Sequence, residues 1–107
     1  MNPPEAVEVH ISAPDAALAE TIARALVADR LAACVQIVPD LTSIYRWEGA
    51  VETATEVLLL AKSSTRHTDR LFDRVRDLHP YAVPEILAIP VVAIDPPYAA
   101  WLAAELA

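Results

Sequence analysis

The sequence contains one glycine and one cysteine among its 107 residues. A single glycine excludes the glycine-rich loops that cradle phosphate groups in nucleotide-binding proteins. A single cysteine, Cys34, excludes a disulfide within the chain. Neither a His-x-x-x-His nor a Cys-x-x-Cys spacing occurs, so no preformed metal site of these kinds is present. Because nothing in the sequence signals a substrate pocket either, we expect a protein that is not an enzyme.

Basic residues are also scarce. Eight Lys and Arg residues against 15 Asp and Glu residues give a net charge of −7. Nucleic-acid binding draws most of its affinity from Lys and Arg on phosphates, so it is not expected. No run approaches the ~18 apolar residues of a membrane span, and residues 1–5 lack the basic and apolar regions of a signal peptide. The sequence therefore predicts a cytoplasmic protein that binds neither nucleic acid nor membrane.

Hydrophobic residues, by contrast, make up 55% of the chain. A chain of this length forms one domain, residues 1–107, which can bury a core without disulfides or metal. Such a small domain cannot bury that much apolar surface by itself. We expect identical copies of the chain to cover the remainder.

The apolar pattern predicts four strands and three helices. The strands are expected at about 7–11, at 34–47 with a break at Pro39-Asp40, at 51–62 and at 86–94, the last interrupted by Pro90, which favours a sheet edge. Helices are expected after the N-cap Asp15 to about Leu31, at 65–78, and from Pro96. Gly49 lies between two strands and predicts a hairpin. The order βαββαβ plus a helix is the α+β ferredoxin-like pattern, which leaves one face of an antiparallel sheet open.

Residues 79–85 form the most informative segment. They place the imidazole of His79, the phenol of Tyr81 and the carboxylate of Glu85 within seven residues that include two prolines. Proline fixes its own φ and disfavours helix at the residue before it. The segment is therefore expected to be a shaped polar corner between a helix and a strand, which suits a binding site and also a simple helix stop.

Two motifs together resemble the CutA family, the divalent-cation tolerance proteins: the hairpin Tyr45-Arg46-Trp47-Glu48-Gly49 and the corner at residues 79–85. Further matching segments, in register along nearly the whole chain, lie at residues 12–15, 31–35 and 97–102. The resemblance implies a ferredoxin-like subunit in a homotrimer, an association with copper and other divalent cations, and no enzymatic activity. The trimer of this family also resembles PII-type signalling proteins, which bind small effectors between subunits.

Three residues are candidate metal ligands on this basis. His79 would supply an imidazole, Glu85 an oxygen donor, and Cys34 a soft ligand for reduced copper. Each has a structural alternative as well. His79 could bond the last helix carbonyls, Glu85 could cap backbone amides, and Cys34 could be a small buried hydrophobe.

A second hypothesis is a PII-like sensor with an effector cleft, and a third is a trimeric scaffold that docks other proteins. The cleft would be lined by Tyr81, Lys62, Trp47 and Tyr45 together with His79 and Glu85, and an anionic effector would need Lys62. Tyr45, Trp47 and His10 are expected at the subunit interface. We also expect Lys62 to pair with Glu85, His67 to be exposed and inert, and Tyr98 and Trp101 to be core residues.

Overall fold

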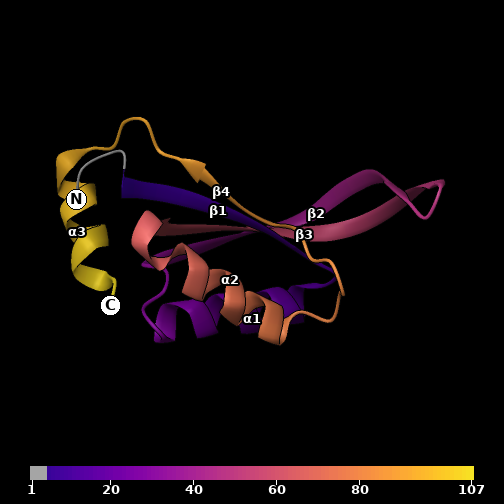
Figure 1. The fold of residues 1–107 in the computed structure, drawn as a ribbon, viewed down its shortest axis with the longest axis horizontal. Coiled ribbons are helices and arrows are strands. Elements are labelled where there is room, and N and C mark those ends of the chain that lie inside the picture. Colours follow the sequence, from indigo (N-terminus) through magenta and orange to yellow (C-terminus); the bar gives the residue numbers. More distant parts are fainter. Residues whose placement is uncertain (1–4) are drawn as a thin grey trace.

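The computed structural model describes residues 5–107, so most of the N-terminal segment used to predict location lies outside it. Two helices cover one face of a four-stranded sheet, and a long hairpin extends from its end (Figure 1). The strands are β1 (Ala6–Ala13), β2 (Cys34–Trp47), β3 (Ala50–Ser64) and β4 (Ile86–Pro90); the helices are α1 (Ala16–Ala28), α2 (Thr68–Leu78), which follows a short 3-10 turn (Thr65–His67), and α3 (Pro96–Glu105). The strand order β2-β3-β1-β4 with antiparallel pairing confirms the predicted α+β ferredoxin-like fold.

Helix α1 begins and ends at residues whose local chemistry explains its length. The Asp15 carboxylate accepts a hydrogen bond from the Leu18 N–H at 2.8 Å, which confirms the predicted N-cap. Arg30 has a φ of 58°, and the Leu31 N–H bonds the Leu26 carbonyl at 2.9 Å. This left-handed turn closes the helix at Ala28, three residues before the predicted end.

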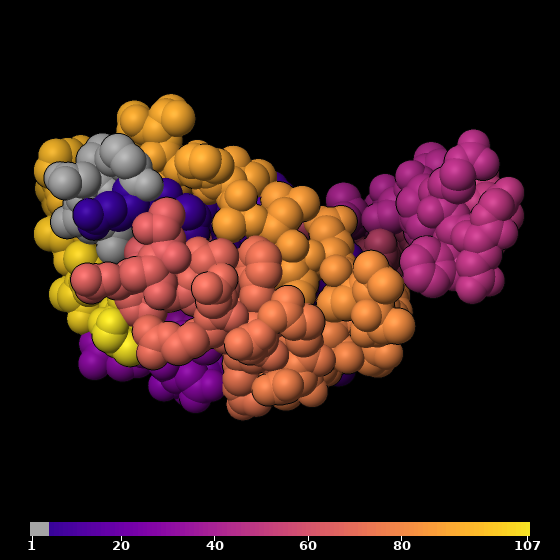
Figure 2. Space-filling view, viewed as in Figure 1, coloured from indigo at the N-terminus to yellow at the C-terminus, as the bar shows by residue number. Residues whose placement is uncertain are grey.

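The predicted hairpin is confirmed at residues 48–49. Glu48 and Gly49 both have positive φ, 49° and 82°, as the two-residue turn of a tight hairpin requires. The turn joins Trp47 to Ala50, which are paired. The hairpin, magenta in Figure 2, stands apart from the body of the molecule.

The predicted break at Pro39-Asp40 is a β-bulge inside one continuous strand. Val38 pairs with Leu58 and Leu41 pairs with Glu56, so β2 has one more residue than β3 at this point. Asp40 takes up the extra residue with a φ of 59°. Because neighbouring side chains alternate between faces, the bulge changes which positions of β2 face a given side.

One face of the sheet packs on α1 and α2 and forms the core. The fully buried side chains come from both layers: Val9, Ile11, Ile22, Leu26, Leu59, Ala61, Leu71 and Val75. The register places another set on the opposite face, which we call the open face: Glu8, His10, Cys34, Leu58, Leu60, Lys62, Leu87 and Ile89. No helix covers this set in the way α1 and α2 cover the core face (Figure 1).

The end of the chain differs from prediction in two respects. Strand β4 ends at Pro90 rather than near Ile94, although it does lie at the sheet edge as Pro90 indicated. Helix α3 buries Ala99 and Leu102, whereas Tyr98 and Trp101 are exposed, so the prediction that these two aromatics are core residues was wrong.

The prediction that His67 is exposed was also wrong. Its Nδ1 accepts a hydrogen bond from the Ser64 hydroxyl at 2.6 Å, and its Nε2 donates to the Ala107 carbonyl at 2.8 Å. His67 is thus a buried link between the start of α2 and the segment after α3. Across residues 5–107, no helix has the length and apolar character needed to cross a membrane.

Candidate functional site

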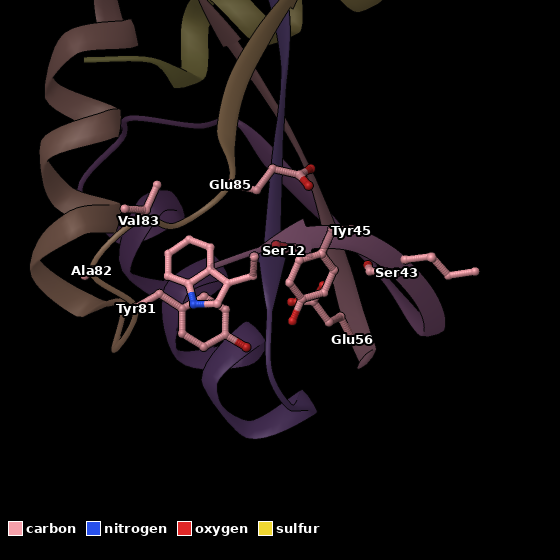
Figure 3. Close-up of a pocket in the computed structure, with 10 residues that line it drawn as sticks. Ser12, Ser43, Tyr45, Glu56, Tyr81, Ala82, Val83 and Glu85 are labelled. Carbon is pink, nitrogen blue, oxygen red and sulfur yellow. The ribbon is translucent and has the colours of Figure 1, made fainter. Parts of the chain in front are cut away.

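A pocket of about 600 Å³ lies where the hairpin leaves the sheet. We call it the hairpin pocket. It is bounded by the hairpin, the end of β1 and the loop between α2 and β4 (Figure 3). Its lining residues are Ser12, Ser43, Ile44, Tyr45, Trp47, Glu56, Tyr81, Ala82, Val83 and Glu85.

The bulge in β2 explains why two aromatic residues reach this pocket. Val38, before the bulge, pairs with Leu58 on the open face. After the bulge, Tyr45 and Trp47 pair with Glu52 and Ala50, which share the alternation of Leu58 along β3. An unbulged strand would place these aromatic rings on the other side of the hairpin.

His79 fixes the loop that closes the pocket. Its Nε2–H donates to the Ser12 carbonyl at 2.7 Å, and its Nδ1 accepts from the Tyr81 N–H at 3.2 Å. The ring also lies against that of Tyr81, with centroids 4.7 Å apart. Because both ring nitrogens are engaged and the side chain is buried, a metal could reach His79 only by displacing one of these bonds.

The pocket lining carries negative and neutral groups, and no Lys, Arg or His. Glu56 is 8% exposed and has no hydrogen-bonding or ion-pairing partner among residues 5–107, and its carboxylate oxygens are open to the pocket. Burial raises the pKa of the Tyr81 phenol, and the nearby Glu56, Tyr45 and Asp15 raise it further. The electrostatic character of the pocket is therefore acidic.

Lys62 lies outside the pocket, and the prediction that it pairs with Glu85 was wrong. Its ammonium bonds the carboxylate of Glu8, which faces it directly across β1 and β3. The other oxygen of Glu8 bonds Nε2 of His10 at 2.9 Å. The hydrogen bond from Lys62, followed by that from His10, lowers the pKa of Glu8.

This network predicts a pH-dependent contribution to stability. A carboxyl group with a lowered pKa stabilises the fold above its ordinary value of 4.5, and the contribution is lost as pH falls through the folded pKa. We expect parent protein to unfold at higher denaturant concentration than Glu8→Gln at pH 7, with the difference shrinking as the pH is lowered below 4.5 and through the folded pKa of Glu8. Equal midpoints for the two proteins at pH 7 would contradict this.

The three candidate metal ligands do not meet within one chain. Cys34 shares a row of the sheet with Lys62 and Glu8, whereas His79 bonds to Ser12, four residues farther along β1. Four residues of strand span about 13 Å. Among residues 5–107, no group of three or more His, Cys, Asp or Glu side chains is close enough to hold a metal ion.

Comparison with known proteins adds the decisive observation. The sequence profile of the family described as CutA1 divalent ion tolerance protein matches residues 7–105. The chain belongs to the CutA1 family. This confirms the resemblance carried by the hairpin and the corner at residues 79–85.

Curated relatives of the CutA1 family match over nearly their whole length. The divalent-cation tolerance protein CutA of Thermus thermophilus is 53% identical over 94 residues, which cover 88% of this chain and 91% of the relative. That of Salmonella newport is 43% identical over 103 residues, 96% of this chain and 90% of the relative.

Solved CutA1 structures share the fold. The Thermus thermophilus protein superposes with a TM-score of 0.93 at 49% identity, covering 95% of this chain and 99% of that one. CutA of Xylella fastidiosa gives a TM-score of 0.93 at 39% identity, covering 96% and 99%. One further relative, from Archaeoglobus fulgidus, is described as periplasmic (TM-score 0.91, 34% identity, 94% and 97% covered). The location given for that relative differs from the cytoplasmic location that we predict for the present chain.

Sequence reasoning found part of the hairpin pocket. Tyr45, Trp47, Tyr81 and Glu85 were predicted at a binding cleft and all line it. Three polar lining residues were missed: Ser12, Ser43 and Glu56. Glu56 did carry a signal, since it borders the apolar run of β3 at one end as Lys62 does at the other.

Proposed function

We propose that this chain works as a cytoplasmic homotrimer that binds a divalent cation, copper in the first place, between its subunits, without catalysing a reaction. One observation carries the proposal: the groups suited to bind metal are dispersed over a single chain, yet several of them lie on a sheet face that no helix covers. Membership of a divalent ion tolerance family supports the choice of ligand class.

The open face supports assembly. Its three leucines and one isoleucine gather around a small polar network, with Leu87 43% and Ile89 40% exposed. Contiguous exposed apolar surface of this kind is typical of protein interfaces. A face of the same composition on a second and third copy would bury these side chains together.

The positions of the donors support a shared site. Cys34 and His10 lie on the open face, two strand spacings apart across the sheet and two residues apart along it, or about 12 Å. Ligands of one ion must lie within about 2 Å of it, so these groups cannot bind the same ion within one chain. Glu85 is exposed at the rim of the hairpin pocket, where a neighbouring subunit could bring Cys34 to it. The thiolate of Cys34 and the imidazole of His10, supplied by different subunits, would together favour copper or zinc.

In this proposal His79 positions the site. The hydrogen bonds to Ser12 and Tyr81 hold the loop that carries Glu85, so His79 sets the position of that carboxylate.

Calorimetric titration of metal-free protein with Cu(II), repeated with redox-inert Zn(II), tests the metal function. We expect saturable binding to the parent, and at least tenfold weaker binding to Cys34→Ser and Glu85→Gln because each loses a donor. Glu20→Gln is the matched control, since its carboxylate pairs with Arg24 on the exposed side of α1. The absence of saturable binding to the parent would refute the metal function.

The hairpin pocket favours a second candidate, a PII-like trimer that binds a small effector. Its volume falls within the range of about 300–1,000 Å³ found for small-molecule sites. It also contains four of the six predicted cleft residues, Tyr45, Trp47, Tyr81 and Glu85, while Lys62 and His79 lie outside its lining.

A further inference from the structure

We infer that the hairpin pocket binds a small organic cation with a substituted ammonium head group, held by Glu56 and a surrounding set of aromatic rings. The inference rests on the second candidate function, because it names the class of effector. This class differs from an anionic effector, which would need Lys62, a residue outside the pocket.

Glu56 is the central observation. Its side chain is more than nine-tenths buried, lines the pocket, and has no hydrogen-bonding or ionic partner among residues 5–107. No buried side-chain oxygen of the described chain lacks a partner, so the unpaired carboxylate oxygens of Glu56 reach the open space of the pocket. A cation in the pocket would meet this carboxylate directly.

The aromatic residues indicate which kind of cation fits. Tyr45, Trp47 and Tyr81 come from two different segments and line the same cavity. Figure 3 shows Tyr45, Tyr81 and Glu56 pointing toward a common region of the pocket. Aromatic faces attract an ammonium ion and accept its apolar substituents, as in sites for quaternary ammonium groups.

Two other ligand classes fit less well. An anion would meet Glu56 and Glu85 with no cationic side chain in the lining to offset them. A bare metal ion would find only these two carboxylates, and the described chain has no set of three metal-binding side chains. It would also gain little from three aromatic rings, because metal ions prefer oxygen, nitrogen and sulfur donors.

Fluorescence of Trp47 provides a direct test. The chain has two tryptophans, so Trp101→Phe, at an exposed position of α3, leaves Trp47 as the only one. The assembled protein would be titrated with choline, with its uncharged carbon analogue 3,3-dimethylbutan-1-ol, and with inorganic phosphate at equal ionic strength. We expect a saturable change with choline alone.

Pocket variants in the same background locate the site. Glu56→Gln removes the charge and keeps the shape, so choline affinity should fall at least tenfold. Tyr45→Leu removes one ring at an exposed position and should also weaken binding, which keeps the test valid if Glu56→Gln folds poorly. Glu52→Gln, on the same strand but outside the lining, should bind choline as the parent does within twofold.

The possible outcomes distinguish a failure of the organic-cation proposal from a failure of the effector function. Saturable binding of phosphate without choline would overturn the cation and leave an effector site. Equal binding of choline and its neutral analogue, or of choline to parent and Glu56→Gln, would overturn the role of Glu56. No saturable change with any of the three probes would overturn both the inference and the effector function.

Discussion

Leu87→Asp is expected to convert the proposed trimer into single chains, whereas Val27→Asp is expected to leave the trimer intact. The two positions are closely matched, with Leu87 43% and Val27 45% exposed in the single chain. They differ in location. Leu87 lies on the open face opposite His10, and Val27 lies on α1, in the layer on the other side of the sheet.

The expected difference follows from the cost of burying charge. An aspartate in contact with water costs little in a single chain, but assembly would force each copy to bury a carboxylate without a partner, at several kcal/mol each. Sedimentation velocity measures the result. Three chains of 11.6 kDa give about 35 kDa for the parent and for Val27→Asp, against about 12 kDa for Leu87→Asp. A mass of about 35 kDa for Leu87→Asp would show that this face is not the interface.

His79→Ala is expected to lower the free energy of unfolding of the metal-free protein by about 2–4 kcal/mol. The imidazole joins the Ser12 carbonyl to the Tyr81 N–H, and it packs against the Tyr81 ring. Removing it leaves two backbone groups without their partner and creates a cavity beside β1. Denaturant unfolding at matched protein concentration gives the value, because the stability of the proposed trimer would depend on concentration.

His79→Gln is the control for this prediction. Its amide can still donate to the Ser12 carbonyl, so it should lose clearly less stability than the alanine variant. If His79 were instead poised as a metal ligand with no structural role, both variants would unfold within about 0.5 kcal/mol of the parent and differ from it only in metal binding.

Local chemistry made the elements of the fold predictable. Asp15 could be recognised as an N-cap because its side chain acts on a residue only three positions away. Gly49 marked the hairpin because few residues other than glycine adopt a φ of 82° at low cost. Pro90 indicated an edge strand because it cannot donate a hydrogen bond to a neighbour.

Errors arose where a residue's partner lies far along the chain. Lys62 pairs with Glu8, 54 positions away, rather than with Glu85, and only the register of β1 against β3 identifies that partner. His67 appeared to be on a charged helix surface, yet the segment after α3 covers it. Tyr98 and Trp101 were expected on the buried side of the last helix, but α3 packs through Ala99 and Leu102.

The candidate site contains both kinds of feature, those set by neighbouring residues and those set by partners far along the chain. The corner at residues 79–85 is a local motif, so Tyr81 and Glu85 could be selected from the sequence. Glu56 carried only the signal of a charge beside an apolar run, because the β-bulge that adds one residue to β2 is what brings Tyr45 and Trp47 to its side of the hairpin. Whether a proline-containing break ends a strand or bulges within it depends on the strand beside it, which the sequence does not specify locally.

The central claim is that the assembly, and not the single chain, holds the divalent cation. Cu(II) titration of metal-free parent, Val27→Asp and Leu87→Asp by calorimetry tests it most directly, at the concentrations at which sedimentation has established their masses. The account predicts saturable binding at the same ratio of metal to chain for the parent and Val27→Asp, and none for the single chains of Leu87→Asp. Equal affinity and equal stoichiometry in all three proteins would place the metal within one chain and contradict the account.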